Sequence, residues 1–195
     1  ELAYNIIHGT FGEDGALQAI LEERGVPYTG AGSRSSALCF DKSESKKVFL
    51  EAGVPTPRAE ILDCSGGIVM PSLPLPFVIK PPCEGSSVGV HIIHKQEDVL
   101  PAMEEAVTHG TTVLVEEFIQ GRELTVGVLD GEALPVIHIC PRSGFYDLSN
   151  KYPWMNMGGG TDYICPADLP EEIAAKVQEA ALKAYRAAGV EVYGR

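Results

Sequence analysis

The chain contains 195 residues, of which 45% are hydrophobic and 22% are charged. This composition is typical of globular domains and excludes a disordered tail, a collagen-like repeat and a fibrous heptad rod. Its 15 basic and 27 acidic side chains give a formal net charge of −12, and a surface this acidic repels nucleic-acid phosphates and anionic lipids. We therefore expect no nucleic acid and no membrane as a partner, and the length fits one domain or two small ones.

The sequence also bears on the cellular compartment. No apolar stretch approaches the length that spans a bilayer, and the first residues, ELAYNIIHG, lack the basic segment and cleavage site of a signal peptide. The cysteines form no CxxC pair and are odd in number, which favours free thiols in a reducing compartment. We therefore expect a cytoplasmic protein. The cysteines are Cys39, Cys64, Cys83, Cys140 and Cys165.

Hydrophobic periodicity and turn residues predict the elements of the first part of the chain. They are a buried strand end at 3–7, a glycine-rich loop at 8–15, helices at 15–24, 33–40 and 42–52, a strand within 54–62, a loop over 64–76 and a strand at 76–81. Leu17, Ile20 and Leu21 share one face of the first helix. Ser33 and Asp41 are expected to cap the next two helices.

The second part of the chain predicts further strands and two long helices. The elements are a strand after the turn in EGSSVGVHII, a helix at 96–108, a strand at 111–119, a hairpin at 122–139, a non-periodic loop at 141–168, a helix at 169–188 and a strand in VEVYGR. Asp130-Gly131 suits the tight turn of the hairpin. Because the chain begins and ends in strands that need partners, we expect an internal piece of a longer protein.

The segment VIKPPCEGSSVGV at 78–90 has the features of a phosphate-binding hairpin. A buried strand delivers Lys80, which supplies a positive charge. Gly85 and Gly89 allow backbone N–H groups to approach an anion closely, and Ser86 and Ser87 add hydroxyl donors. The alternative, an ordinary turn whose lysine reaches water, is equally compatible with this segment alone.

Acidic residues follow the next predicted strand, in LVEEFIQGRELTV. Glu116 and Glu117 precede the apolar pair Phe118-Ile119, and Glu123 lies between apolar segments. A carboxylate facing sugar hydroxyls, beside backbone groups that contact a flat base, would suit a nucleoside. Acids at a strand end are usually only solvated, and this alternative stays open.

Other candidate residues lie in loops and at a helix start. Lys42 opens a predicted helix, where its charge opposes the helix dipole by about a few tenths of a kcal/mol; this suits either an anion site or a solvated lysine. The loop after residue 141 carries Tyr146, Lys151 and Tyr152, which could cover a site and exclude water or form a flexible surface loop.

The order and spacing of these motifs resemble those of the D-alanine–D-alanine ligases of the ATP-grasp fold. The matching motifs are HGxxGEDG, YTGxGxxxSAxxxDK, FVIKPxxEGSSVGV, LVEEFIxGRELTV, FYDxxxKY, CPA and YGR. The resemblance implies an α+β (α/β) fold in which two subdomains clasp ATP, preceded by the remainder of a Rossmann-like N-terminal domain. It places that remainder at 1–32, the central subdomain at 33–115 and the C-terminal subdomain at 116–195.

The resemblance also implies an activity. Members join two D-alanines to D-alanyl-D-alanine for peptidoglycan precursors: the first carboxylate takes the γ-phosphoryl group of ATP, and the second amine displaces phosphate from the acylphosphate. Alternatives are a ligase for D-alanine and D-lactate or D-serine, another ATP-grasp carboxylate–amine ligase, and a non-catalytic nucleotide-binding module. Within the family, the pair Lys151-Tyr152 accompanies the dipeptide product, which favours D-alanine as the second substrate.

The family's functional residues match positions across this chain. Lys42 and Lys80 would bind the α- and β-phosphates, Glu116 with the backbone of 117–119 would hold adenine, and Glu123 would bind the ribose. The full set expected at ATP is Lys42, Lys80, Glu84, Ser86, Ser87, Val88, Glu116, Glu117, Phe118, Ile119 and Glu123.

The resemblance also implies catalytic and substrate-binding residues. Lys151 would neutralise the transferring phosphoryl group, and Arg195 would stabilise the oxyanion of the tetrahedral intermediate. Ser86 and Tyr152 would orient the loop and the substrate. The residues expected near the first D-alanine or covering it are His8, Glu13 and Tyr146.

The resemblance also implies expectations about the longer protein. The family's ligands for Mg²⁺ (or Mn²⁺) would follow Arg195, so no metal ligand is expected in this chain. We therefore expect the chain alone to bind nucleotide without turnover. The full-length protein is expected to form a homodimer, as is common in the family.

Overall fold

A computed structural model describes residues 1–142, 144, 146, 148–151 and 160–195. The helices are α1 (Ala16–Glu23), α2 (Ser33–Phe40), α3 (Lys42–Glu51), α4 (Val99–Ala106), α5 (Leu148–Lys151) and α6 (Glu171–Ala187), with 3-10 turns η1 (Gln96–Asp98) and η2 (Val107–His109). The strands are β1 (Ala59–Asp63), β2 (Phe77–Lys80), β3 (His91–Ile93), β4 (Thr112–Glu117), β5 (Glu123–Thr125), β6 (Val128–Leu129), β7 (Glu132–Ala133), β8 (Ile137–Pro141), β9 (Thr161–Ile164) and β10 (Tyr193–Gly194).

An antiparallel four-stranded sheet in the order β1-β4-β2-β3 holds the main apolar core. Side chains alternate between the two faces of a strand. Phe77 and Ile79 of β2 and Val113 and Val115 of β4 belong to one buried cluster with Met103 of α4. The intervening residues of the same strands therefore point to the other face, away from α4.

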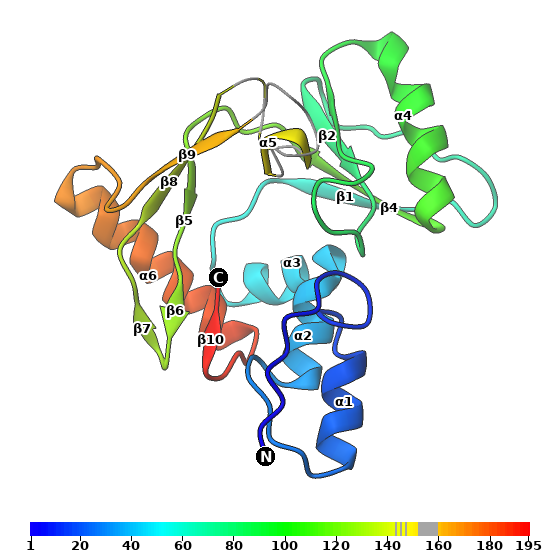
Figure 1. The fold of residues 1–195 in the computed structure, drawn as a ribbon. Coiled ribbons are helices and arrows are strands. Elements are labelled where there is room, and N and C mark those ends of the chain that lie inside the picture. Colours follow the sequence, from blue (N-terminus) through cyan, green and yellow to red (C-terminus); the bar gives the residue numbers. More distant parts are fainter. Residues whose placement is uncertain (143, 145, 147, 152–159) are drawn as a thin grey trace.

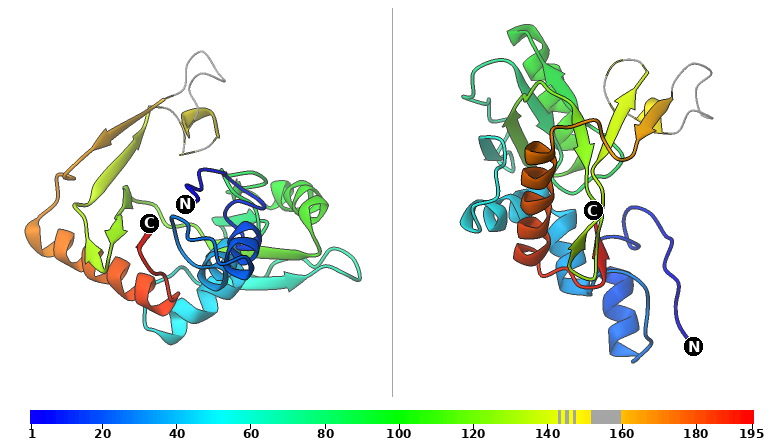
Figure 2. Two further views of the ribbon diagram at one scale, coloured as in Figure 1. Left: turned by 60° about the horizontal axis from the view of Figure 1, so that its bottom comes forward. Right: turned by 90° about the vertical axis from the view of Figure 1, so that its left-hand side faces the viewer.

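Two three-stranded sheets, β5-β8-β9 and β10-β6-β7, form the other half of the molecule. Asp130 and Gly131 join β6 to β7 with φ angles of 49° and 78°, which confirms the predicted tight turn. α6 contacts β6 and β7 and also α3. The two halves lie on either side of α5 (Figure 1), and α6 runs along the outside of its sheets (Figure 2).

Several predicted elements are confirmed, and others are wrong. The helices at 33–40, 42–52 and 169–188 and the hairpin of β2 with β3 are present. The strand expected at 3–7 is reduced to a single bridge between Ala3 and Tyr28, because an apolar run forms a strand only where a neighbouring strand pairs with it. Tyr4 is 74% exposed instead of buried.

The buried face of α1 and the cap of α2 differ from expectation. Gln18 is 5% exposed whereas Ile20 is 39% exposed, and the Gln18 amide donates a hydrogen bond to the carbonyl of Gly12. Ser33 does not cap α2, since its hydroxyl instead donates to the Glu22 carboxylate at 2.6 Å. Asp41 does cap α3, as predicted.

The loop expected at 141–168 contains regular structure, α5 and β9. β9 pairs with β8 along its whole length, a non-local contact that local periodicity does not report. The expected division between residues 115 and 116 falls inside β4, since Glu116 and Glu117 still pair with β2. Among the described residues, no helix is both long and apolar enough to cross a membrane.

Candidate nucleotide site

Three charged side chains meet on the face of the sheet that points away from α4. Val78 of β2 lies opposite Glu116 of β4, and Lys80, two residues further along β2, shares that face. The Glu116 carboxylate pairs through one oxygen with Lys80 and through the other with Lys46 of α3, at 2.7 Å for Lys46. Lys46 is 6% and Glu116 8% exposed, so this group is largely shielded from water.

The ion pairs decide the charge state of Glu116. Burial alone would raise the pKa of this carboxyl, but the ammonium groups of Lys80 and Lys46 outweigh burial and lower the pKa overall. Glu116 is therefore an anion at neutral pH. Its carboxylate is engaged by two lysines, of which Lys80 was predicted for the site and Lys46 was not.

Lys46 was missed because its role depends on how α3 approaches β4. Its ammonium donates to Thr56 Oγ1 and to the carbonyl of Pro57, both at 2.6 Å, besides pairing with Glu116. One signal was available: Lys46 follows Lys42 by four residues in a predicted helix, and such residues lie on the same helix face.

Lys42 lies at the start of α3, beside the turn that follows β2. Asp41 caps the helix by accepting hydrogen bonds from the backbone of Ser43 and Glu44. The Lys42 ammonium donates to the carbonyls of Pro82 and Glu84. Burial lowers the pKa of Lys42, and repulsion from Lys80 lowers it further. The positive charges of Lys42 and Lys80 thus act on each other, and an anion bound near them would relieve this repulsion.

The turn at 84–88 carries local backbone strain. Ser86 and Ser87 have φ angles of 53° and 63°, in the left-handed region that non-glycine residues rarely adopt. A Cβ at Gly89, with φ of 65°, would lie 2.8 Å from Pro81. Backbone strain of this kind concentrates at ligand-binding segments. At the start of the same turn, the Glu84 carboxylate lies 3.4 Å from His109.

α5 brings Lys151 to this turn from 64 positions away in sequence. The Lys151 ammonium donates to Ser87 Oγ at 2.9 Å and lies 4.8 Å from the centre of the Tyr146 ring. Ser87 Oγ in turn donates to the carbonyl of Tyr146 at 3.1 Å. The predicted turn and the predicted covering loop are therefore adjacent in space.

Tyr146 links this group to β9 and to the end of the chain. Its hydroxyl lies 2.7 Å from that of Tyr163. Burial, followed by the hydrogen bond with Tyr163, raises the pKa of Tyr146 to about 12, with Arg195 acting in the opposite direction. Loss of solvent raises the pKa of Glu123, and the nearby Lys151 opposes it. Glu123, Lys151, Tyr146 and Arg195 thus influence one another electrostatically.

The remaining predicted residues of the nucleotide site lie at the end of β4, just after it, or in the turn at 84–88. The N–H groups of Glu117 and Phe118 donate to the carbonyls of Arg58 and Pro76, so these two donors are not available to a base. The Phe118 ring packs edge-on against His94. Ile119 and Val88 are 62% and 39% exposed.

The first glycine-rich loop stands apart in the structure. His8 lies 3.8 Å from Glu13, and their side chains are 85% and 53% exposed. No contact described for either residue reaches the lysines. Tyr152 lies outside the described residues.

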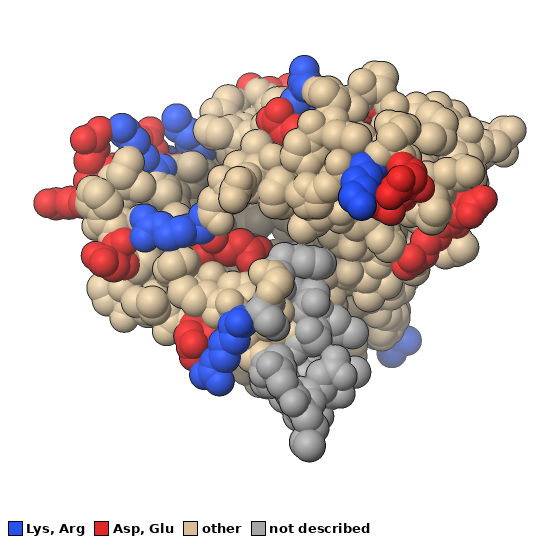
Figure 3. All heavy atoms as spheres, turned by 90° about the horizontal axis from the view of Figure 1, so that it is seen from above, with Lys and Arg blue, Asp and Glu red and all other residues tan. Residues whose placement is uncertain are grey.

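The described residues offer no fit for a metal ion. Within 1–142, 144, 146, 148–151 and 160–195, no three His, Cys, Asp or Glu side chains form a group that could hold one. Seen from above, the surface carries scattered acidic and basic side chains without a continuous basic patch (Figure 3).

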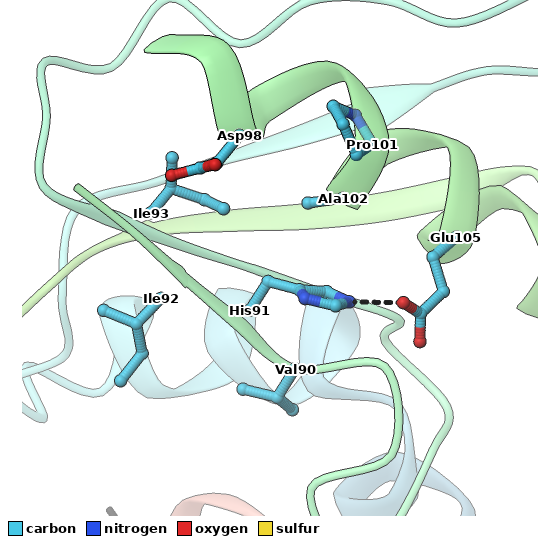
Figure 4. A pocket seen from close by; sticks show the side chains of 8 residues that line it. All are labelled: Val90, His91, Ile92, Ile93, Asp98, Pro101, Ala102 and Glu105. Atoms are coloured by element: carbon cyan, nitrogen blue, oxygen red, sulfur yellow. Dashed lines mark ion pairs between the residues drawn. The ribbon is translucent and has the colours of Figure 1, made fainter. Parts of the chain in front are cut away.

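A separate groove of about 470 Å³ lies between β3 and α4 (Figure 4). His91 Nε2 lies 3.0 Å from a Glu105 oxygen there, without hydrogen-bond geometry. His91 lies opposite Ile79 in the sheet, so it shares the face of α4. The groove and the lysines are therefore on opposite sides of the sheet. It is lined by Val90, His91, Ile92, Ile93, Asp98, Pro101, Ala102 and Glu105.

The chain is similar in sequence to known ligases. The chain is 42% identical over 190 residues to a D-alanine–D-alanine ligase of Syntrophotalea carbinolica, covering 97% of this chain and 61% of the relative. A D-alanine–D-alanine ligase of Bordetella petrii is 44% identical, with 97% and 59% covered. The chain thus spans about 60% of these relatives' length.

Solved structures show the same fold. The D-alanine–D-alanine ligase of Bacillus anthracis complexed with ATP matches with a TM-score of 0.81 at 30% identity, over 98% of this chain and 61% of that one. The VanG D-Ala:D-Ser ligase of Enterococcus faecalis matches with a TM-score of 0.82 at 32% identity, over 97% and 57%. The α+β, ATP-grasp expectation is confirmed. Residues 63–195 match the family described as D-ala D-ala ligase C-terminus, and the chain belongs to this family.

Proposed function

We propose that this chain supplies the ATP-binding part of an enzyme that ligates two D-alanines to D-alanyl-D-alanine, using ATP through an acylphosphate. The observation that carries the proposal is the convergence of Lys42, Lys80 and Lys151 from three separate elements on or beside the strained turn at 84–88. Phosphoryl transfer depends mainly on positioning and charge neutralisation. The relatives named above carry the same activity in their names.

The proposed roles follow the positions of the side chains. Lys42 and Lys80 neutralise the α- and β-phosphates, and the turn at 84–88 covers them. Lys151 neutralises the phosphoryl group in transfer, and Ser87, which accepts its hydrogen bond, orients it. Arg195, close enough to act on Tyr146, stabilises the oxyanion that forms when the second amine attacks.

The other assigned residues complete the proposed site. Glu116 and the backbone of 117–119, through groups other than the engaged N–H groups of Glu117 and Phe118, contact adenine, with Phe118 against the base, and Glu123 binds the ribose hydroxyls. Ser86 and Tyr152 orient the turn and the substrate. His8 and Glu13 lie near the first D-alanine. Glu84, Ser87 and Val88 complete the covering turn.

The second substrate is the finer part of the proposal. Named relatives at 42–44% identity favour D-alanine, whereas the VanG neighbour is a ligase for D-alanine and D-serine. The decisive assay measures phosphate release from ATP by the whole protein, since the chain alone is expected to bind nucleotide without turnover, with D-alanine alone and with D-lactate or D-serine added. Dipeptide formation that needs only D-alanine supports the proposal. ATP binding with no release would leave a nucleotide-binding module.

A mutant separates binding from chemistry at the same site. Lys151→Ala should lower turnover more than ATP affinity, because its charge acts on a group that moves in the transition state. Calorimetry with ATP and the phosphate-release assay together measure the two effects. A loss of ATP affinity with unchanged turnover at saturating ATP would remove the catalytic role proposed for Lys151.

Further parts of the proposal concern the whole protein. We propose that it requires Mg²⁺ or Mn²⁺, forms a homodimer and resides in the cytoplasm, and that 1–32, 33–115 and 116–195 approximate its structural divisions. Chelation with EDTA during turnover tests the metal requirement. Sedimentation tests the dimer, and limited proteolysis tests the divisions.

A further inference from the structure

Lys46 is a buried cation that cannot itself bind a ligand in this arrangement. Its ammonium group has three N–H donors, and these meet three acceptors: Glu116, Thr56 Oγ1 and the Pro57 carbonyl. The residue is 6% exposed. Its influence on the nucleotide site must therefore pass through Glu116, the one charged group among its partners.

The charges around Glu116 show what Lys46 contributes. Glu116 engages Lys46 and Lys80 through different oxygens, so the three side chains together carry one net positive charge. Without Lys46, Glu116 and Lys80 would form a neutral pair. We propose that Lys46 is a positioning residue: it neutralises Glu116, so that the positive charge of Lys80 remains available to a polyphosphate. This inference rests on the proposed nucleotide site.

A purely structural role would not require this arrangement. Burying charges costs desolvation free energy, and a buried ion pair is often no more stable than apolar side chains of the same volume. A third buried charge adds to that cost without completing an apolar core. With Glu116 neutralised by Lys46, Lys80 carries an uncompensated positive charge. The Lys80 side chain is 21% exposed, so this charge can act on an anion at the edge of the site.

Binding of inorganic tripolyphosphate tests the proposal without any contact to a base. Lys46→Met should weaken binding by about tenfold, the size expected when one charge-assisted interaction is lost. Lys46→Arg should retain most of the affinity. Lys47→Met is the matched control, because Lys47 is its exposed neighbour on α3 and pairs with Glu44. Calorimetry measures all four proteins, after thermal unfolding has confirmed that each is folded.

A compensating variant distinguishes charge from damage to the fold. Lys46→Met combined with Glu116→Gln removes one positive and one negative charge, so Lys80 again carries the net charge of the group. Tripolyphosphate affinity should then return most of the way to that of the wild type. If the double variant binds as weakly as Lys46→Met, the proposal is overturned.

A readout without ligand keeps this inference separate from the proposed function. Competitive acetylation followed by mass spectrometry gives the reactivity of the Lys80 amine. Lys46→Met should slow its acetylation several-fold, because Glu116 would then pair with Lys80 alone, and the double variant should reverse this. If the wild type binds no tripolyphosphate, the nucleotide site fails while acetylation still decides the role of Lys46. Unchanged Lys80 reactivity in Lys46→Met overturns the inference.

Discussion

The two faces of the four-stranded sheet are built from the same strands and serve different ends. Ile79 and Lys80 are neighbours in β2, yet Ile79 joins the apolar cluster under α4 and Lys80 joins Glu116 on the other face. The first face lowers free energy by removing apolar surface from water. The second face holds buried charges at a desolvation cost. Substitution of Ile79 should therefore change mainly stability, whereas substitution of its neighbour Lys80 should change mainly ligand binding.

The largest expected effect is the loss of the buried carboxylate. Glu116→Gln leaves Lys46 and Lys80 without their shared anion and should destabilise the fold by roughly 3–5 kcal/mol at neutral pH. Because the folded-state pKa of Glu116 is lowered, its contribution is present above the ordinary value of 4.5 and is lost as the pH falls below it. The difference in the free energy of unfolding between the wild type and Glu116→Gln should therefore become smaller at acid pH.

Urea unfolding of the wild type and of Glu116→Gln, from neutral pH down to about pH 3, measures this difference in the free energy of unfolding. The range extends below the ordinary pKa of carboxyl groups, which is about 4. Glu172→Gln is the control, since Glu172 is 78% exposed in a surface pair. A gap that stays constant across the range would show that the ion pairs with Glu116 contribute nothing to stability.

The apolar face should give a similar loss of stability with no loss of binding. Ile79 is fully buried, so Ile79→Ala should destabilise the fold by about 2–5 kcal/mol through lost burial and a cavity. Urea unfolding measures this effect, and calorimetry with ATP on the folded variant should find unchanged affinity. A parallel loss of ATP affinity would mean that the two faces are not independent.

Lys80→Ala should instead weaken ATP binding and have a smaller effect on stability. Loss of a charge-assisted contact is worth about 1.5–3 kcal/mol, or on the order of 10- to 100-fold in ATP affinity, while stability should change less than in Glu116→Gln. Lys95→Ala serves as the control, because Lys95 is 71% exposed. An unchanged ATP affinity in calorimetry would remove Lys80 from the site.

The smallest expected effect concerns the N-terminal caps of α3 and α4, the helices that lie beside the two faces of the sheet. Asp41 caps α3 with its side chain, so Asp41→Ala should cost about 0.5–2 kcal/mol. Asp98 stands at the same position of α4 but makes no side-chain cap bond, so Asp98→Ala should cost less. Urea unfolding of both variants measures the difference, and equal losses would contradict the cap assigned to α3.

Local features of the fold were predictable from the sequence, whereas approaches between distant segments were not. The helices at 33–40 and 42–52, the Asp41 cap and the Asp130-Gly131 turn are encoded by neighbouring residues. β9 escaped prediction because its pairing with β8 spans a segment without periodicity. The strand at 3–7 was expected from an apolar run, but apolarity alone supplies no partner for a strand's backbone.

The candidate site divides in the same way. Lys80 and the turn at 84–88 were predictable because the strand, glycines and serines are contiguous. The family resemblance implied that Lys151 acts on the same phosphates, but not its contact with Ser87, since no local pattern joins residues 64 positions apart. Lys46 reads as an ordinary helix lysine until α3 is placed against β4, and the full use of its three donors is a property of that tertiary contact.

The hydrogen bond between the hydroxyl groups of Tyr146 and Tyr163 should be observable through the ultraviolet absorbance of tyrosine. Because the pKa of Tyr146 reaches about 12 through its partial burial and its hydrogen bond with Tyr163, this phenol should ionise at a higher pH than an ordinary tyrosine, which ionises near pH 10. Any event that draws Tyr146 away from β9 would bring its tyrosinate absorbance to a lower pH. Because burial also raises the pKa of Tyr28 to about 12, the difference between the titration of the wild type and that of Tyr146→Phe would report, without an added dye, whether the segment carrying Tyr146 and Lys151 is docked.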